Sequence, residues 1–316
     1  MKVHTLIGKC ARLICACLPF VLPASGYAQG AFDDVFIFGD SISDAGNVFA
    51  LTGETSSAPY ALVPSRPYKV GGHHFSNGKT WAERFAQNLH DTSGGNASLK
   101  HPGINGNYAF GGARARSGSG NPSPDSATQV FLYLGDYQSA TAEALFVLQF
   151  GGNDIRDALL AAQLGEDPFV ILDNAAQSVA AAIQTLYARG ARNFLIANSP
   201  NLAHAPAIIL SGASGFAGLL TAYFNGVLEG QLQLVEGAIG DINIIRLDMA
   251  GFTDAVVATP ADFGLTNVAV PCLNFMTENE AKCEDPEKRL FWDGIHPTAA
   301  AHNELADFAT SVVNGS

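Results

Sequence analysis

One buried strand and the turn after it constrain this chain more than any other part of its sequence. The run Val35–Phe38 is apolar without a polar break, which indicates a strand buried on both faces. Gly39 then allows a sharp turn, and Ser41 follows at the place where open α/β sheets bind their ligands. Asp44 and Asn47 are turn and cap formers, so we expect a helix to begin just beyond them. Most serines after strands only cap turns, so the rest of the chain must decide whether Ser41 is a nucleophile.

Apolar runs alternate with amphipathic stretches along the whole chain. This alternation predicts an α/β fold, with a parallel sheet and helices on both of its faces. The expected strands are Val35–Phe38, Tyr108–Phe110, Leu145–Phe150, Phe194–Ala197 and Ile242–Leu247, and the expected helices include Thr80–Leu89, Phe169–Ala188, Ala217–Val235 and Thr298–Val313.

The N-terminus has the pattern of a secretory signal peptide. Basic residues from Lys2 to Arg12 precede the apolar run Leu13–Leu22, and the small residues Gly26 and Ala28 follow it. The apolar run is too short to cross a bilayer, so a membrane anchor is the weaker interpretation. We expect cleavage near Ala28 and a soluble, secreted or periplasmic protein.

Residues 29–316 are enough for one sizeable α/β domain, and we predict a single domain. The whole chain has a formal net charge of −12, and removal of the basic N-terminal segment makes the mature protein more acidic. Such a charge argues against nucleic acid or an anionic membrane as the main partner. No second long apolar run is present, so no integral membrane segment is expected in the mature chain. The oligomeric state stays open.

Two cysteines remain once the signal peptide and its three cysteines are removed. Cys272 and Cys283 would then lie in an oxidising compartment, where we predict that they form a disulfide. Two free thiols are the alternative.

A second candidate for chemistry lies just before the last predicted helix, where Asp293 and His296 are three residues apart. On a turn, this spacing lets the carboxylate orient the imidazole and stabilise its charged form. An Asp-x-x-His pattern is common, and a structural role is the alternative.

Two further stretches supply candidate hydrogen-bond donors at the ends of predicted strands. Residues 107–113 end in the pair Gly111 and Gly112, where a backbone N–H can approach a ligand without an intervening side chain. Residues 150–154 carry Asn153, whose side-chain amide is another donor. The alternative for both is an ordinary turn into a helix, with Asn and Asp as caps.

Together these stretches resemble the GDSL family of the SGNH hydrolase superfamily of lipases and esterases. The family's four blocks occur in its order as Gly39–Ser41, Asn107–Ala113, Gly151–Asp154 and Asp293–His296. The segment Phe75–Trp81 also resembles a stretch of the longer members. The resemblance implies a three-layer α/β/α sandwich with a five-stranded, mainly parallel, flavodoxin-like sheet.

The resemblance also implies roles for single residues. Ser41 would be the nucleophile, His296 the general base, and Asp293 the residue that orients His296. The oxyanion donors would be the backbone N–H groups of Ser41 and Gly112 and the side chain of Asn153. The family's glycine block is degenerate, so the neighbouring glycine, residue 111, stays open as the alternative to Gly112.

Other chemistries fit the sequence less well. The chain has no Gly-x-Ser-x-Gly motif, so the nucleophile elbow of α/β-hydrolases is absent. The histidines His73–His74 and His101 lack metal-ligand spacing, and we expect them to be solvated loop residues. Asp40, Asp44 and Asp154 could in principle bind a divalent metal, but such a site would give no role to the Asp-x-x-His pair. We therefore predict no metal and no cofactor.

The predicted function is that of a secreted serine esterase or lipase acting on a small-molecule or lipid ester. Three alternatives stay open: a lipid acyltransferase or phospholipase, a carbohydrate O-acetylesterase, and a non-catalytic binding module on the same fold. The loop aromatics could shape an acyl pocket or could be ordinary packing; they are Tyr60, Tyr68, Phe75, Phe252 and Phe263. The acyl length and the alcohol portion are not encoded in any motif.

Overall fold

The computed structural model describes residues 32–53, 68–276 and 282–315. The predicted signal peptide and its cleavage site near Ala28 lie outside these residues, as does Tyr60. No helix in the described part of the chain combines the length and the apolar character that a membrane crossing requires.

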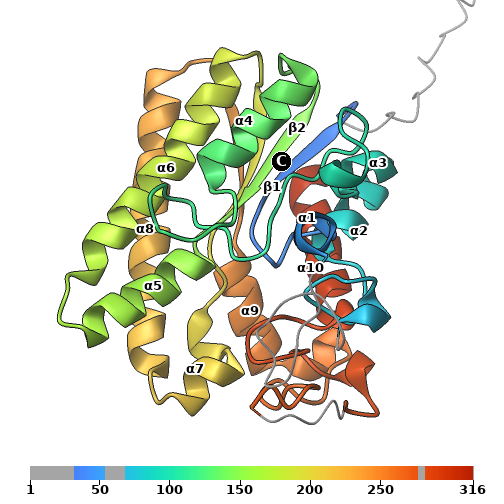
Figure 1. The fold of residues 1–316 in the computed structure, drawn as a ribbon, viewed down its shortest axis with the longest axis vertical. Coiled ribbons are helices and arrows are strands. Elements are labelled where there is room, and N and C mark those ends of the chain that lie inside the picture. The colour runs from blue at the N-terminus through green and yellow to red at the C-terminus, as the bar shows by residue number, and fades with distance from the viewer. Residues whose placement is uncertain (1–31, 54–67, 277–281, 316) are drawn as a thin grey trace, which may run out of the picture.

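A parallel sheet forms the centre of the molecule (Figure 1). Its strands are β1 (Val35–Gly39), β2 (Leu145–Gln149), β3 (Asn193–Ala197) and β4 (Asn243–Leu247), paired in that order. All three pairings are parallel, and Gly39 lies opposite Gln149 at the last position of β1 and β2. The carboxyl ends of all four strands therefore meet at one edge, where the expected ligand site lies.

The sheet has four strands among the described residues, not the predicted five. The segment Tyr108–Phe110 runs beside the free edge of β1, where the Tyr108 N–H donates to Ile37 O at 2.7 Å and the Phe110 N–H donates to Gly39 O at 3.0 Å. The return hydrogen bond of a regular ladder is missing, because the Gly39 N–H donates to Gln129 Oε1 at 2.9 Å instead. The segment thus occupies the place of an edge strand without forming one.

The position of this edge segment still gives the chain a flavodoxin-like order. Counted along the sequence, β1 comes first, the edge segment second, and β2, β3 and β4 follow. The order across the molecule is then 2-1-3-4-5, and its switch point lies between β1 and β2. Ser41 lies on the turn after β1, and Asn153 lies on the first turn of the helix that follows β2.

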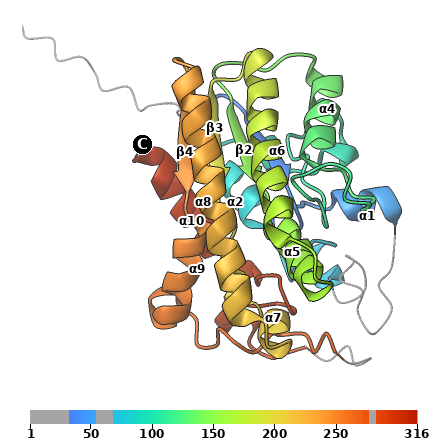
Figure 2. The ribbon, with the colours of Figure 1, turned by 90° about the vertical axis from the view of Figure 1, so that its left-hand side faces the viewer.

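Helices cover both faces of the sheet, which confirms the predicted α/β architecture (Figures 1 and 2). One face packs against α4 (Ser126–Tyr137), α5 (Gly152–Gln163), α6 (Pro168–Ala188) and α8 (Ser214–Ala238). The other packs against α2 (Trp81–Asn88), the start of α9 (Met249–Ala258) and α10 (Ala299–Asn314). The shorter helices are α1 (Asn47–Thr52), α3 (Thr92–Gly95) and α7 (Pro206–Leu210).

Successive strand residues alternate between the two cores, as the period of a strand requires. Phe36 and Phe38 of β1 enter the core under α4 and α6, whereas Val35 and Ile37 enter the core under α2 and α10. Both sets are buried, which explains why the sequence of β1 is apolar throughout.

We predict that Gln129→Met lowers the free energy of unfolding by about 2 kcal/mol, because the buried Gly39 N–H would lose its acceptor. Urea unfolding of the variant and the wild type measures the difference. Gln163→Met, at an exposed position of α5, is the control and should change the stability little. Equal stability of Gln129→Met and the wild type would contradict the role assigned to this hydrogen bond.

Candidate active site

Ser41 lies directly after β1, on a turn that begins at Asp40. The N–H groups of Ser43 and Asp44 both donate to Asp40 O, at 3.1 and 3.0 Å, so the chain reverses immediately after the strand. Gly39 permits this packing, since a Cβ there would lie 2.7 Å from Gln149 O. The turn places the Ser41 side chain at the carboxyl edge of the sheet.

The structure brings Ser41, His296 and Asp293 together although 255 residues separate the first two. His296 Nε2 lies 2.8 Å from Ser41 Oγ, and His296 Nδ1 lies 2.7 Å from Asp293 Oδ2. Ser41 is 8% exposed, His296 3% and Asp293 0%. The three side chains form a continuous chain of hydrogen bonds that is almost completely shielded from solvent.

The Asp293 carboxylate is held by its own turn. Its Oδ1 accepts from the N–H groups of Ile295 and His296, each at 2.8 Å, and the Trp292 N–H closes the turn by donating to His296 O at 2.8 Å. Burial alone would raise the pKa of Asp293, but the neighbouring imidazole and the two backbone donors outweigh it and lower the pKa. Asp293 is therefore an anion that fixes the proton of His296 on Nδ1.

Tyr68 is part of this group, and sequence reasoning missed that role. Its hydroxyl donates to Asp293 Oδ2 at 2.8 Å, the same oxygen that faces His296. The sequence suggested Tyr68 only as a pocket or packing aromatic. No local signal could have found the contact, because the two residues are 225 positions apart.

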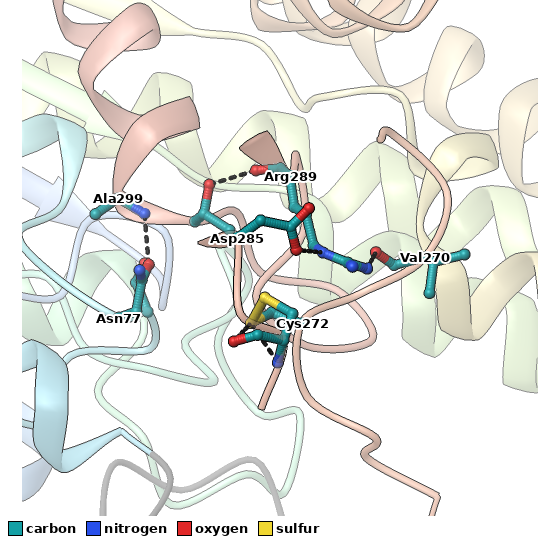
Figure 3. Close-up of a disulfide and its surroundings, with 9 residues drawn as sticks. Asn77, Val270, Cys272, Asp285, Arg289 and Ala299 are labelled. Atoms are coloured by element: carbon teal, nitrogen blue, oxygen red, sulfur yellow. Dashed lines mark hydrogen bonds and ion pairs between the residues drawn. A yellow bond between two sulfur atoms is a disulfide. The ribbon is translucent and has the colours of Figure 1, made fainter. Parts of the chain in front are cut away.

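The segment after Tyr68 supports the other side of the histidine turn. Ser76 Oγ donates to Pro297 O at 2.8 Å. Asn77 Oδ1 accepts from the Ala299 N–H at 2.7 Å (Figure 3). The Phe75 ring lies with its centroid 5.1 Å from that of His296. The segment that resembled a stretch of longer family members thus holds the turn that carries His296.

A disulfide between Cys272 and Cys283 supports the chain before Asp293 (Figure 3). The N–H groups of Cys272 and Leu273 donate to Phe291 O and Trp292 O, at 3.0 and 2.7 Å. Cys272, Leu273 and Trp292 form one buried cluster with the Tyr68 side chain. The cross-link therefore lies directly against the residues that position the Asp293 carboxylate.

The ion pair next to the disulfide fixes the same region. Arg289 Nε lies 2.8 Å from Asp285 Oδ1, and its Nη1 donates to Val270 O at 3.3 Å (Figure 3). These contacts join the two sides of the cross-linked loop.

Two backbone N–H groups beside Ser41 make no hydrogen bond with any described residue: those of Ser41 and Gly112. The Gly111 N–H, in contrast, donates to Asp44 Oδ2 at 2.8 Å and is not available to a ligand. Gly112 has a φ of 77°, a left-handed conformation that suits a glycine. This geometry favours Gly112 over Gly111 as the oxyanion glycine.

Asn153 presents its side-chain amide from the first turn of α5. One N–H of Nδ2 donates to Ala113 O at 3.0 Å, and Oδ1 accepts from Arg156 Nη1 at 3.2 Å. The two contacts orient the amide and leave its second N–H for a ligand.

Buried polar side chains around Ser41, among them Asp44, which the sequence marked only as a turn or cap former, hold the loops together. Asp44 accepts from the N–H groups of Gly46, Asn47 and Val48 at the start of α1 as well as from Gly111. Asn107 Nδ2 donates to Ser43 O at 2.8 Å. Ser43 Oγ in turn accepts from Trp81 Nε1 at 3.1 Å and donates to Gln149 Oε1 at 2.8 Å. These contacts tie the turn of Ser41 to its neighbours.

Asp40 adds a carboxyl group next to the nucleophile candidate. Burial raises its pKa to about 6, against the opposing effects of a hydrogen bond from the Ile42 N–H and of the nearby Gln149 and His296 side chains. Asp154 is satisfied separately, since it accepts from the Ala115 N–H at 2.8 Å and pairs with Arg116 at 2.6 Å. No group of His, Cys, Asp or Glu side chains suited to a metal ion occurs in the described ranges.

One expectation about the histidines is wrong. His74 is buried and lies 2.9 Å from Glu83 Oε2, whereas we expected it to be solvated. The capping of α2 by Glu83, which accepts from the Thr80 N–H at 2.9 Å, brings the carboxylate to His74. His73 stacks on the Phe49 ring, and His101 is exposed.

A cavity of about 90 Å³ opens beside Ser41, His296 and Asn153. Most of its wall is apolar. One part comes from α9, α10 and the chain before Asp293, namely Met249, Phe252, Leu290, Phe291, Ala301 and Leu305, and another comes from Leu202, Ala205 and Ile208 in and just before α7. Of the loop aromatics suggested from the sequence, Phe252 lines the cavity. Phe263 packs against Phe252, with 5.6 Å between the two ring centroids.

The fold and the hydrogen-bonded serine, histidine and aspartate define the class of protein, a hydrolase of the SGNH superfamily. The model of the GDSL-like lipase/acylhydrolase family matches residues 35–309, nearly all of the described chain. The chain belongs to this family, which confirms the resemblance found in the sequence.

Known proteins are similar to this chain at low identity. A GDSL esterase/lipase of Arabidopsis thaliana is 23% identical over 331 residues, covering 87% of this chain and 84% of the relative. The thermolabile hemolysin of Vibrio parahaemolyticus is 26% identical over 86% of this chain and 62% of its own length. Among solved structures, a carbohydrate acetylesterase from Sinorhizobium meliloti is 13% identical, with a TM-score of 0.47 over 89% of this chain and 97% of the other.

We predict that Cys272→Ser combined with Cys283→Ser lowers the free energy of unfolding by about 3 kcal/mol, because the unfolded chain regains the entropy of a loop closed across 11 residues. Thermal unfolding with and without dithiothreitol measures the effect. The reductant should destabilise the wild type by a similar amount and leave the double variant unchanged. A double variant as stable as the oxidised wild type would contradict the prediction.

Proposed function

We propose that this chain is an exported serine esterase that hydrolyses carboxylic esters through an acyl-enzyme on Ser41. The observation that carries the proposal is the 2.8 Å contact between Ser41 Oγ and His296 Nε2, on an imidazole whose other nitrogen faces a buried carboxylate. Membership of the GDSL-like lipase/acylhydrolase family supports the class of reaction. The cavity beside Ser41 determines which esters bind.

In the first step, His296 Nε2 takes the proton of Ser41 as its Oγ attacks the ester carbonyl. The negative charge of Asp293 stabilises the imidazolium that forms, and the carboxylate keeps the ring oriented through Nδ1. The carbonyl oxygen becomes an oxyanion, which the N–H groups of Ser41 and Gly112 and the amide of Asn153 would stabilise. Collapse of this intermediate passes the proton from His296 to the departing alcohol.

In the second step, His296 takes a proton from water, and the hydroxide portion attacks the acyl carbon. The same donors hold the second oxyanion, and release of the acid returns the proton to Ser41. The apolar wall of the cavity suits the acyl chain, because burial of its methylene groups is favourable by about 0.8 kcal/mol each.

The proposal includes export from the cytoplasm. Its support is the basic and apolar pattern before Ala28, together with the disulfide, since disulfides persist in oxidising compartments. N-terminal sequencing of the protein recovered from the medium or the periplasm tests this part.

The central test is hydrolysis of p-nitrophenyl esters from acetate to palmitate by the wild type and by Ser41→Ala. Loss of the nucleophile should lower kcat by several orders of magnitude, because the remaining groups cannot form the acyl-enzyme. The dependence on acyl length reports the depth of the cavity, and added alcohol that diverts product from acid to ester would reveal acyl transfer. Wild-type activity in Ser41→Ala would contradict the proposed mechanism.

Tyr68→Phe should lower kcat by about 10-fold with little change in KM, since it removes one hydrogen bond to the charged Asp293 and leaves the cavity wall intact. Kinetics on the best p-nitrophenyl ester measure both constants. Tyr223→Phe is the matched control, because Tyr223 also donates to a carboxylate, Asp173 at 2.9 Å, away from the site. If both variants keep the kcat of the wild type, Tyr68 has no positioning role.

A further inference from the structure

Arg156 lies at the cavity beside Ser41 without a carboxylate partner in the described part of the chain. It is on the first turns of α5, lines the cavity and is exposed to solvent. Its one side-chain hydrogen bond to a described residue is that from Nη1 to Asn153 Oδ1, at 3.2 Å. It forms no ion pair with any carboxylate in residues 32–53, 68–276 and 282–315.

The neighbouring arginines are different. Arg114 pairs with Asp157 at 2.7 Å, and Arg116 pairs with both Asp154 and Asp157, at 2.6 Å each. Carboxylates are not scarce either, because the chain has 29 Asp and Glu against 17 Lys and Arg. The missing partner of Arg156 is therefore a local feature of the cavity.

The surroundings of Arg156 favour an anion. Although Arg156 reaches solvent, partial desolvation by the protein around its guanidinium lowers its pKa, and the positive charge of Arg114 lowers it further, against smaller opposing effects of Asp157, Asp293 and Asp40. An arginine nevertheless stays charged at neutral pH. The N-terminus of the twelve-residue helix α5 adds a positive partial charge on the same side of the cavity. An anionic ligand group would compensate the positive charges of Arg156 and Arg114 and the partial charge of the α5 N-terminus.

The two sides of the cavity differ in chemistry. Met249, Phe252 and Leu305 form an apolar side on α9 and α10. The other side combines the polar Asn153 and Arg156 of α5 with the apolar Leu202 and Ile208. These helices lie on opposite sides of the sheet (Figure 1). An ester bound at Ser41 with its acyl chain on the apolar side places its alcohol portion toward Arg156.

We propose that Arg156 is a specificity residue that binds an anionic group, a carboxylate or a phosphate, on the alcohol portion of the ester. This inference rests on the proposed esterase function. A guanidinium offers two parallel donors to either group, which suits both a phosphate-bearing glyceride and an ester of an acidic alcohol. Arg156 selects the substrate, and Ser41, His296 and Asp293 carry out the reaction.

The test compares matched pairs of butanoyl esters that differ in one charge. The first pair is the ester of 3-hydroxybenzoate and that of 3-hydroxybenzamide; the second is 1-butanoylglycerol 3-phosphate and 1-butanoylglycerol. We expect the wild type to favour an anionic member by about 10- to 100-fold in kcat/KM, the range of a charge-assisted hydrogen bond. A preference in only one pair identifies carboxylate or phosphate as the group recognised.

Arg156→Gln should abolish this preference, and Arg156→Lys should keep part of it. The ratio within a pair is the readout, because a mere disturbance of Asn153 lowers both members by the same factor. Arg192→Gln is the control, since Arg192 is paired with Asp241 at 2.9 Å.

Hydrolysis of the neutral esters without any anionic preference would overturn this inference and leave the esterase function standing. A preference that survives in Arg156→Gln would also overturn it. If the wild type hydrolyses no ester of either pair or of the p-nitrophenyl series, the proposed function fails as well.

Discussion

The Asp293 carboxylate is the group on which the geometry of the site depends. It is fully buried, and it accepts hydrogen bonds from two backbone N–H groups of its own turn, from His296 and from Tyr68. A buried carboxylate without such donors would cost several kcal/mol or take up a proton. The donors and the anion therefore stabilise one another, and together they aim His296 at Ser41. The disulfide and the segment after Tyr68 pack around this arrangement and hold it in place.

The irregular edge of the sheet serves the same site. A complete ladder at the edge of β1 would engage the Gly39 N–H with a fifth strand, but Gln129 takes that group instead. The edge segment can then bend after residue 110, where Asp44 binds the Gly111 N–H and the Gly112 N–H is left without a partner among the described residues. Donors of this kind stabilise a developing charge well because they are already oriented before the reaction begins. The loss of regular secondary structure therefore coincides with the gain of an oriented donor.

Much of the fold and part of the site were predictable from the sequence. Strands such as β1 are buried on both faces, so their apolar runs predict them from the sequence. Ser41, Asn153 and the Asp-x-x-His pair were found because each is tied to a local pattern, a strand end or a turn. Tyr108–Phe110 was wrongly predicted as a strand. Its apolar pattern is that of a strand, but the Gly39 N–H donates to the distant Gln129 side chain and not to this segment.

The sequence by itself determined the elements and the residues of the site that local spacing reveals. Only the tertiary structure decided which groups meet: Tyr68 with Asp293, His74 with Glu83, and Arg156 with no carboxylate among the residues that the structure describes. It also favoured Gly112 over its neighbour, because Asp44 occupies the other N–H. The physical reason is that hydrogen bonding and charge compensation depend on distance in space. Packing of the helices and loops sets that distance, and no periodic pattern along the chain records it.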